Sequence, residues 1–155
     1  MTAVLITGMS GVGKSTVLTE LAERGYETVD TDYGDWIHVV GGEPLWREEL
    51  VDGLLDGTRN GPLFVQGTVA NQVGFYPRFD AVVLLSAPPE VIFHRLRTRT
   101  GNDFGKTADQ LARIARDIEE TEPLLRASAT HELDTTGPVE SVVDALIQIA
   151  DQAGR

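Results

Sequence analysis

Eight residues near the start of the chain have the types and spacing of a phosphate-binding loop, or P-loop. They fit the pattern G-x-x-x-x-G-K-[ST] and are Gly8, Met9, Ser10, Gly11, Val12, Gly13, Lys14 and Ser15. Glycines let the backbone curl until several N–H groups face one anion, and a helix that begins near Lys14 adds its positive end. Lys14 can reach the outer phosphates, and the Ser15 hydroxyl can ligate Mg²⁺. We therefore predict that Gly8 through Thr16 bind ATP with Mg²⁺.

Two aspartates lie at the end of the second predicted strand, where it runs into a loop. Asp30 and Asp32 stand two positions apart, a spacing that would normally place them on opposite faces of a strand. The loop that follows can turn both toward the phosphates. One could then hold a water of the Mg²⁺ shell while the other accepts the proton of an attacking hydroxyl. The alternative is a pair of turn or helix-capping aspartates, which are common after a strand.

The densest positive cluster lies in the second half of this acidic chain. It comprises Arg95, Arg97, Arg99 and Lys106, around a segment with glycines at 101 and 105. A basic loop between glycines suits a lid that closes over ATP and excludes water. We place this lid at about residues 99–107. The alternative is an ordinary solvated helix face.

Short apolar runs alternate with helical patterns along the chain. Strands are predicted at 4–7, 27–32, 63–67, 81–85 and 132–135, and helices at 14–24, 45–56, 87–98, 107–128 and 139–150. Residues 33–46 give no clear pattern. The alternation predicts a three-layer α/β fold with a five-stranded parallel sheet and helices on both faces. Ligands bind such sheets at the carboxyl ends of the strands, where the P-loop, Asp30 and Asp32 fall.

Composition narrows the classes of partner. The chain has 155 residues, which predicts one domain, and no cysteine, which excludes disulfides and thiolate metal sites. A net charge of −11 disfavours nucleic acid and anionic lipid as partners. No apolar run is long enough to span a bilayer, and no signal-peptide pattern is visible before the first strand, so we expect neither a membrane span nor a secreted protein. We expect a cytoplasmic protein, a monomer with a dimer as the alternative.

The chain resembles the small P-loop metabolite kinases of the shikimate kinase and gluconate kinase group, which share the nucleoside-monophosphate-kinase-like, P-loop NTPase fold. The resemblance spans nearly the whole length. The motifs that carry it, in chain order, are the P-loop, Asp30-Thr31-Asp32, Arg99-Thr100-Gly101-Asn102, Glu122-Pro123-Leu124-Leu125 and Asp134-Thr135-Thr136.

The resemblance implies a role for five further residues. Asp30 looks like the carboxylate that supports Mg²⁺ through water, and Asp32 like the one that binds and activates the acceptor hydroxyl. Arg99 looks like a catalytic lid arginine that lies against adenine or the phosphates. Lys106 stands where the family has a lid cation on the γ-phosphate, and Pro138 looks like part of the adenine wall.

Two departures from shikimate kinases concern the acceptor. Their Gly-Gly-Gly run after the third strand is replaced here by residues 66–71, of which Gly67 is kept. Their arginine before the Pro-Leu pair, which grips the substrate carboxylate, is replaced by Glu122. A wall lined by Asp32, Asp35 and Glu122, with Gln66, Asn71 and Gln72 nearby, would repel an anion, so it favours a neutral or amine-bearing alcohol over shikimate. Gly67 is predicted to contact the same substrate. The alternative is that Glu122 lies on a solvated helix face.

The overall prediction is a kinase that transfers phosphate from ATP to the hydroxyl of a small metabolite. A nucleoside or nucleotide kinase on the same fold would need arginines for an acceptor phosphate, and Arg47, Arg59 and Arg78 are candidates. A third possibility is a regulatory, AAA-like ATPase without an acceptor. No guanine-recognition motif of the Asn/Thr-Lys-x-Asp type is present, which disfavours a GTPase.

Overall fold

The five strands predicted from the sequence form one parallel sheet. A computed structural model describes residues 2–57, 59–98 and 107–154, and its main sheet has the strand order β2-β5-β1-β6-β7. The strands are β1 (Ala3–Thr7), β2 (Glu27–Asp30), β5 (Leu63–Gln66), β6 (Ala81–Ser86) and β7 (His131–Asp134). Every neighbouring pair is parallel, so all carboxyl ends meet at one edge, which we call the P-loop edge.

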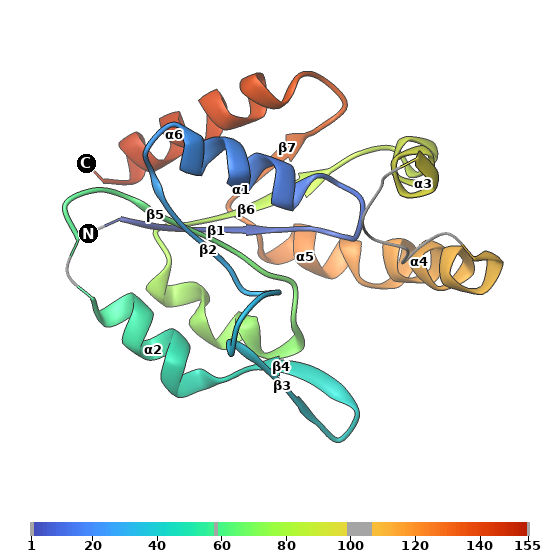
Figure 1. The fold of residues 1–155 in the computed structure, drawn as a ribbon, viewed down its shortest axis with the longest axis horizontal. Coiled ribbons are helices and arrows are strands. Elements are labelled where there is room, and N and C mark those ends of the chain that lie inside the picture. Colours follow the sequence, from blue (N-terminus) through green and yellow to red (C-terminus); the bar gives the residue numbers. More distant parts are fainter. Residues whose placement is uncertain (1, 58, 99–106, 155) are drawn as a thin grey trace.

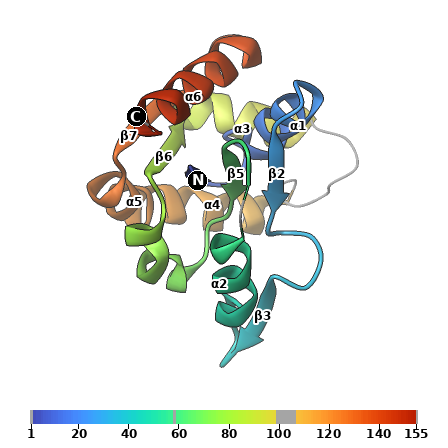
Figure 2. The same cartoon turned by 90° about the vertical axis from the view of Figure 1, so that its left-hand side faces the viewer.

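Helices cover both faces of this sheet, as expected (Figures 1 and 2). The first face carries α1 (Lys14–Glu23) and α6 (Val139–Ala153), and the second carries α2 (Glu48–Asp56), the 3₁₀ helix η1 (Ala70–Arg78) and α5 (Glu122–Ser128). The remaining helices, α3 (Pro89–Thr98) and α4 (Ala108–Glu120), lie beyond the P-loop edge. None of the helices described is long and apolar enough to cross a membrane.

The core follows the alternation of side chains along the central strands. Val4, Ile6 and Phe64 face the α1 and α6 layer, while Leu5 and Val65 face the α2 and η1 layer. All these side chains are buried, because each face of the sheet is covered. The sheet is therefore a rigid platform, and its P-loop edge holds the loops that follow the strands.

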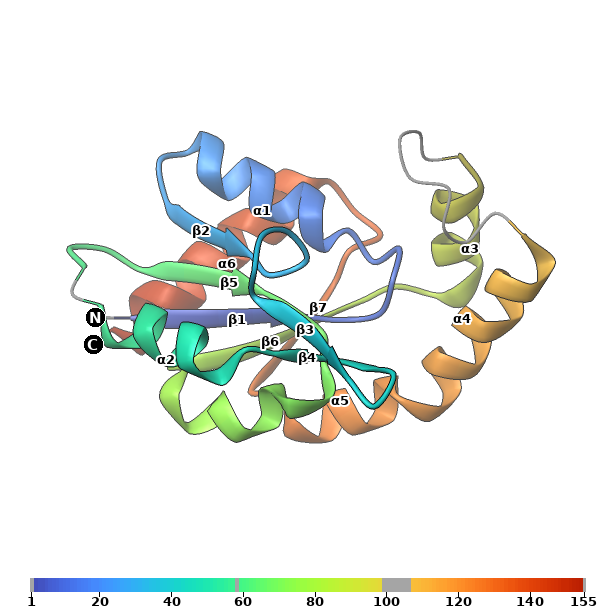
Figure 3. The same ribbon diagram turned by 60° about the horizontal axis from the view of Figure 1, so that its bottom comes forward.

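Residues 37–46 form an element that the sequence pattern does not reveal. β3 (Ile37–Val40) and β4 (Glu43–Trp46) pair antiparallel as a separate hairpin, which lies below the main sheet in Figure 1 and in front of it in Figure 3. The prediction that residues 45–56 are one helix is wrong at its start. Trp46 pairs with Ile37 in the hairpin and is fully buried, and the helix begins only at Glu48.

The long helix predicted over 107–128 is also corrected. It is divided into α4 and α5 at Thr121, which is followed by Glu122 and Pro123 in the first turn of α5. Pro123 is tolerated there because the first residues of a helix have no intrahelical partner for their N–H groups. The new start places Glu122 at the beginning of a helix that packs near β6.

Candidate active site

The P-loop curls as its glycines require. Gly11 and Gly13 have φ of 86° and 102°, a left-handed region that residues with a side chain rarely adopt. Gly13 caps α1, which begins at Lys14, so the positive end of the helix faces the centre of the loop. The Val12 side chain is fully buried in the core and anchors the middle of the loop. The loop thus has the conformation of an anion-binding nest.

Lys14 folds back over this loop. Its Nζ donates to the carbonyl oxygens of Gly8, at 2.5 Å, and Met9, at 3.1 Å. Burial lowers the pKa of Lys14 to about 8, while the negative charges of Asp32 and Asp30 act in the opposite direction. A lysine in this state is charged at neutral pH and close to two carboxylates on the same edge of the sheet.

Asp30, Asp32 and Ser15 come together beside the P-loop, joined by Gln66 at the end of β5. The Gln66 Nε2 donates to Asp30 Oδ1 at 2.6 Å and to Asp32 Oδ2 at 2.8 Å. Asp30 also accepts from the Asp32 backbone N–H at 3.0 Å and from the Ser15 hydroxyl at 3.4 Å. The loop after β2 therefore does turn both aspartates toward the P-loop, despite the two-residue spacing.

The oxygen donors at this point suit Mg²⁺. Ser15 Oγ and Asp30 Oδ2 lie 3.4 Å apart, and Mg²⁺ prefers one or two protein oxygens completed by water and phosphate. Within the ranges that the structure describes, no group of three or more His, Cys, Asp or Glu side chains could hold a metal by itself. The residues present thus fit a metal that arrives with a nucleotide.

A pocket of about 190 Å³ opens on the other side of the P-loop, beneath α3. It is bounded by Val12 and Gly13 of the loop, Thr16 and Val17 of α1, Arg95, Thr135, Gly137, and Val139 and Val142 of α6. Sites that enclose a whole drug-sized ligand measure about 300–1,000 Å³, so this pocket suits one part of a nucleotide. Pro138, predicted as adenine wall, is exposed between two of the lining residues.

Arg95 forms one wall of this pocket. Its guanidinium donates to the Val12 carbonyl at 3.2 Å, and to the Thr135 hydroxyl and carbonyl at 3.0 Å and 2.5 Å. The side chain therefore ties α3 to both the P-loop and the loop after β7. Arg99 and Lys106, the two lid cations predicted from the sequence, lie outside the described residues.

The residues predicted to bind the acceptor differ in their burial and in their contacts. Asp35 is exposed in the loop after Asp32. Gly67 is buried, and a Cβ added there would lie 2.7 Å from Thr31 Oγ1 and 2.8 Å from the Trp46 ring. Glu122 is 8 % exposed, and its Oε1 accepts from Arg126 at 3.1 Å while its Oε2 is buried without a partner. Glu122 is thus not on a solvated helix face.

Two roles at this site were not predicted from the sequence. Gln66 holds both aspartates, and the Thr68 hydroxyl donates to the Gly8 carbonyl at 2.8 Å, which braces the start of the P-loop. A polar residue at the end of an otherwise apolar strand was the available signal for Gln66. Thr68 carries no such signal, because hydroxyl residues are common in any loop.

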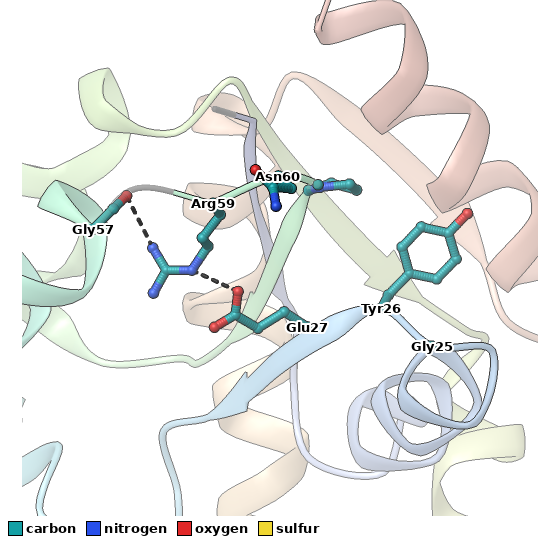
Figure 4. A pocket seen from close by; sticks show the side chains of 8 residues that line it. Gly25, Tyr26, Glu27, Gly57, Arg59 and Asn60 are labelled. Atoms are coloured by element: carbon teal, nitrogen blue, oxygen red, sulfur yellow. Dashed lines mark hydrogen bonds and ion pairs between the residues drawn. The ribbon is translucent and has the colours of Figure 1, made fainter.

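A larger pocket lies at the opposite edge of the sheet (Figure 4). It measures about 550 Å³ and lies between Tyr26, Glu27 and the segment around Arg59. Arg59 donates to Glu27 at 2.6 Å and to the Leu54 carbonyl at 2.7 Å, so its charge is already matched by the protein. This hollow contains none of the residues of the P-loop edge.

Comparison with known proteins identifies the fold family. A family model described as an AAA domain matches residues 4–122, which include the P-loop and both aspartates. The chain belongs to this family. Several of its relatives are named as shikimate or adenylate kinases, in agreement with the resemblance seen in the sequence.

Three of these similarities illustrate the range of kinases. A shikimate kinase from Rhodopseudomonas palustris is 30% identical over 93% of this chain and 78% of its own. A putative adenylate kinase from Thermococcus gammatolerans is 31% identical over 96% of this chain and 85% of its own. A shikimate kinase from Acinetobacter baumannii, solved in complex with shikimate, superimposes with a TM-score of 0.70 at 20% identity, over 98% and 94% of the two chains. This P-loop kinase thus resembles enzymes with different acceptors.

Proposed function

We propose that this P-loop kinase uses ATP and Mg²⁺ to phosphorylate a hydroxyl group of a small metabolite. One observation carries the proposal: Asp30 and Asp32 are joined by Gln66 on the same edge as Lys14 and Ser15. Phosphoryl transfer needs charge neutralisation, a metal and an oriented acceptor. Lys14 supplies the first, Ser15 and Asp30 support the second, and Asp32 serves the third.

Each side chain would then have one role. The P-loop N–H groups and Lys14 hold the phosphates, and the pocket beside Arg95 takes the base. Mg²⁺, when bound, neutralises charge on the phosphates. Asp32 accepts the proton of the acceptor hydroxyl. At the same time the hydroxyl oxygen of the acceptor bonds to the γ-phosphorus, and the bond from this phosphorus to the departing ADP oxygen breaks. Arg99, Lys106 and Pro138 keep the roles that the family resemblance implies for them.

The acceptor proposed here is a neutral or amine-bearing alcohol other than shikimate. Its support is the acidity of the predicted wall: Asp32 and Asp35 are exposed, and Glu122 has one oxygen without a hydrogen-bond donor. A carboxylate or phosphate on the acceptor would be repelled by these groups, whereas hydroxyl and ammonium donors would be attracted.

The test is a screen for acceptor-dependent ATP consumption. Purified protein is incubated with MgATP and separate pools of neutral, cationic and anionic alcohols, and ADP release and phosphorylated products are measured. We expect ADP release above background only with the neutral or cationic pool, and none with Asp32→Asn. A preference for anionic alcohols would overturn the proposed acceptor class. ATP hydrolysis that no pool stimulates would favour an ATPase without an acceptor.

A nucleotide kinase is the second candidate, and Arg47 is the observation that favours it. Of the three arginines considered for an acceptor phosphate, Arg59 pairs with Glu27, and Arg78 pairs with Asp52 and Asp56. The Arg47 Nε, in contrast, is buried and has no hydrogen-bond partner. Including nucleoside monophosphates in the screen separates the two candidates. Phosphorylation of a monophosphate that is lost in Arg47→Met would establish the second.

A further inference from the structure

The Gln66 side chain makes hydrogen bonds that a contribution to folding stability alone does not explain. It is fully buried at the end of β5, and its single Nε2 group donates one hydrogen to each of two carboxylates. Asp30 and Gln66 are direct neighbours in the sheet, so their side chains leave the same face. The amide therefore reaches both aspartates without leaving the strand end.

This orientation leaves the other end of the amide unmatched. Gln66 Oε1 is buried and accepts no hydrogen bond. A buried acceptor without a donor costs free energy, yet the reverse orientation would place Oε1 against two carboxylates. The negative charges of the aspartates thus determine which way the amide points. Leucine would fill similar space without the unmatched oxygen, which suggests that the amide is kept for the carboxylates.

The backbone of Gln66 is held as firmly as its side chain. Its carbonyl accepts from the Thr31 N–H at 3.2 Å and from the Thr31 hydroxyl at 2.9 Å. The same hydroxyl accepts from the Trp46 indole at 3.0 Å. Gln66 is therefore fixed by Thr31, which lies between the two aspartates in sequence, and Thr31 is held in turn by Trp46. The amide is thus a rigid support for both carboxylates.

The bridge leaves each aspartate one oxygen for another partner. Asp30 Oδ1 accepts from Gln66 and from the Asp32 N–H, so its Oδ2 faces Ser15. Asp32 Oδ2 accepts from Gln66, and its Oδ1 has no hydrogen-bond partner among the residues described. One oxygen of Asp30 thus faces Ser15, and one oxygen of Asp32 is left for a partner from outside the described residues.

We propose that Gln66 is the positioning residue that assigns the two aspartates their separate tasks. Its amide directs Asp30 to the metal beside Ser15 and leaves the free oxygen of Asp32 for the acceptor hydroxyl. The inference rests on the proposed function, since it presupposes a metal and an acceptor at this edge. Gln66 itself touches neither reactant and acts through both carboxylates.

The test compares Gln66→Leu and Gln66→Glu with Gln72→Leu as the matched control. Gln72 is another buried glutamine whose Nε2 donates twice, to the Thr7 and Tyr76 hydroxyls instead of to carboxylates. Two quantities are measured: kcat with the best acceptor, and the affinity of the protein–ADP complex for Mn²⁺, which requires no acceptor.

For Gln66→Leu we expect a melting temperature within about 3 °C of the parent, because the unmatched oxygen disappears together with the two hydrogen bonds. We expect kcat to fall about 10- to 100-fold, with Mn²⁺ bound about tenfold more weakly, as for other residues that orient metal-supporting groups. Gln66→Glu should lower kcat further, because a third carboxylate repels the other two. Gln72→Leu should leave the Mn²⁺ affinity at the parental value.

Parental kcat and Mn²⁺ affinity in folded Gln66→Leu would overturn the inference. A Mn²⁺ affinity lowered equally by Gln72→Leu would also overturn it, since the effect would then follow core packing. If no acceptor is found for the parent protein, the proposed function fails, and the Mn²⁺ measurement alone decides whether Gln66 positions Asp30. Should Gln66→Leu not fold, Gln66→Met, which keeps the length of the side chain, replaces it.

Discussion

The two edges of the sheet differ in the volume of their pockets and in how far their polar groups are already paired. The larger pocket is the one whose charges are paired. The edge away from the P-loop has the larger hollow, about 550 Å³, against about 190 Å³ beside Arg95. In the larger hollow the charge of Arg59 is matched by Glu27 (Figure 4). At the P-loop edge, Lys14 is partly desolvated, the carboxylates stand close together, and Gln66 has an unmatched oxygen.

This contrast shows that polar groups still available to a ligand, and not the volume of a pocket, distinguish the candidate active site. A hollow whose polar groups already satisfy one another offers a ligand little beyond contact area. A small site with a curled backbone, a lysine of lowered pKa and free carboxylate oxygens gains interactions when an anion and a metal arrive. Substitutions at the two edges test this difference.

Asp32→Asn should have the largest effect. Removing a general base costs about 10²- to 10⁴-fold in rate, so acceptor phosphorylation should fall by that factor while ATP binding stays largely intact. Rate assays and calorimetric titration with an ATP analogue measure the two quantities. An equal loss of both would argue against Asp32 as the base and in favour of a role in nucleotide binding.

Lys14→Met should lower kcat/KM for ATP about 10²- to 10³-fold, as expected when one charged donor to a transferring group is removed. The same change removes a charge that burial disfavours, so the free energy of unfolding should rise or stay level at pH 7. Chemical denaturation measures this. Lower stability together with lower activity would show that the lysine mainly supports the loop.

Nucleotide affinity should fall as pH rises through about 8, where Lys14 loses its proton. Losing one charge-assisted contact weakens binding about tenfold. In Asp32→Asn the fall should occur at lower pH, because the Asp32 charge raises the pKa of Lys14. Fluorescence titrations between pH 6 and 10 measure this affinity for the parent protein and for Asp32→Asn. An unchanged midpoint in Asp32→Asn would show that the Asp32 charge does not influence the pKa of Lys14.

The lysine also predicts a trend in stability without ligand. Its folded pKa, about 8, is below its ordinary 10.5, so the unfolded chain binds more protons between these values. The contribution of Lys14 to the free energy of unfolding should therefore rise with pH across this window. Lys14→Met, which cannot titrate, serves as the control.

Arg59→Met should have the smallest effect. It removes an ion pair with an exposed partner at the far edge, worth about 0–1 kcal/mol, together with the hydrogen bond to the Leu54 carbonyl, worth about 1 kcal/mol, and both lie at the edge away from the P-loop. Thermal unfolding and steady-state kinetics should show a small loss of stability with kcat/KM unchanged. A large loss of activity would show that the far edge takes part in function.

The sequence predicts the strands and the P-loop edge well, because the physical causes are local. Each buried strand is a short apolar run, and each turn of the P-loop needs glycine at a particular position. Asp30 and Asp32 could be placed at this edge from chain order alone, since carboxyl ends of parallel strands meet there.

The missed features depend on contacts between distant residues. Trp46 is fixed in the hairpin by Asn71, whose side-chain amide exchanges two hydrogen bonds with the Trp46 backbone at 2.9 Å and 3.0 Å. The bridge by Gln66 depends on the pairing of β2 with β5, and the pairing of Glu122 with Arg126 depends on where α5 begins. No periodicity within a short window reports such contacts.

The Asn71–Trp46 pair has a consequence for engineering the acceptor side. Because β3 and β4 form a two-stranded sheet of their own, the segment that follows Asp32 is separate from the main sheet. It is attached there through Trp46, whose buried indole donates to Thr31. Residues 33–45 could then be exchanged as a cassette between related kinases, with residues 46 and 71 retained as the docking point. Under the proposed function, we expect such chimaeras to take their choice of acceptor from the donor and their nucleotide binding from the host.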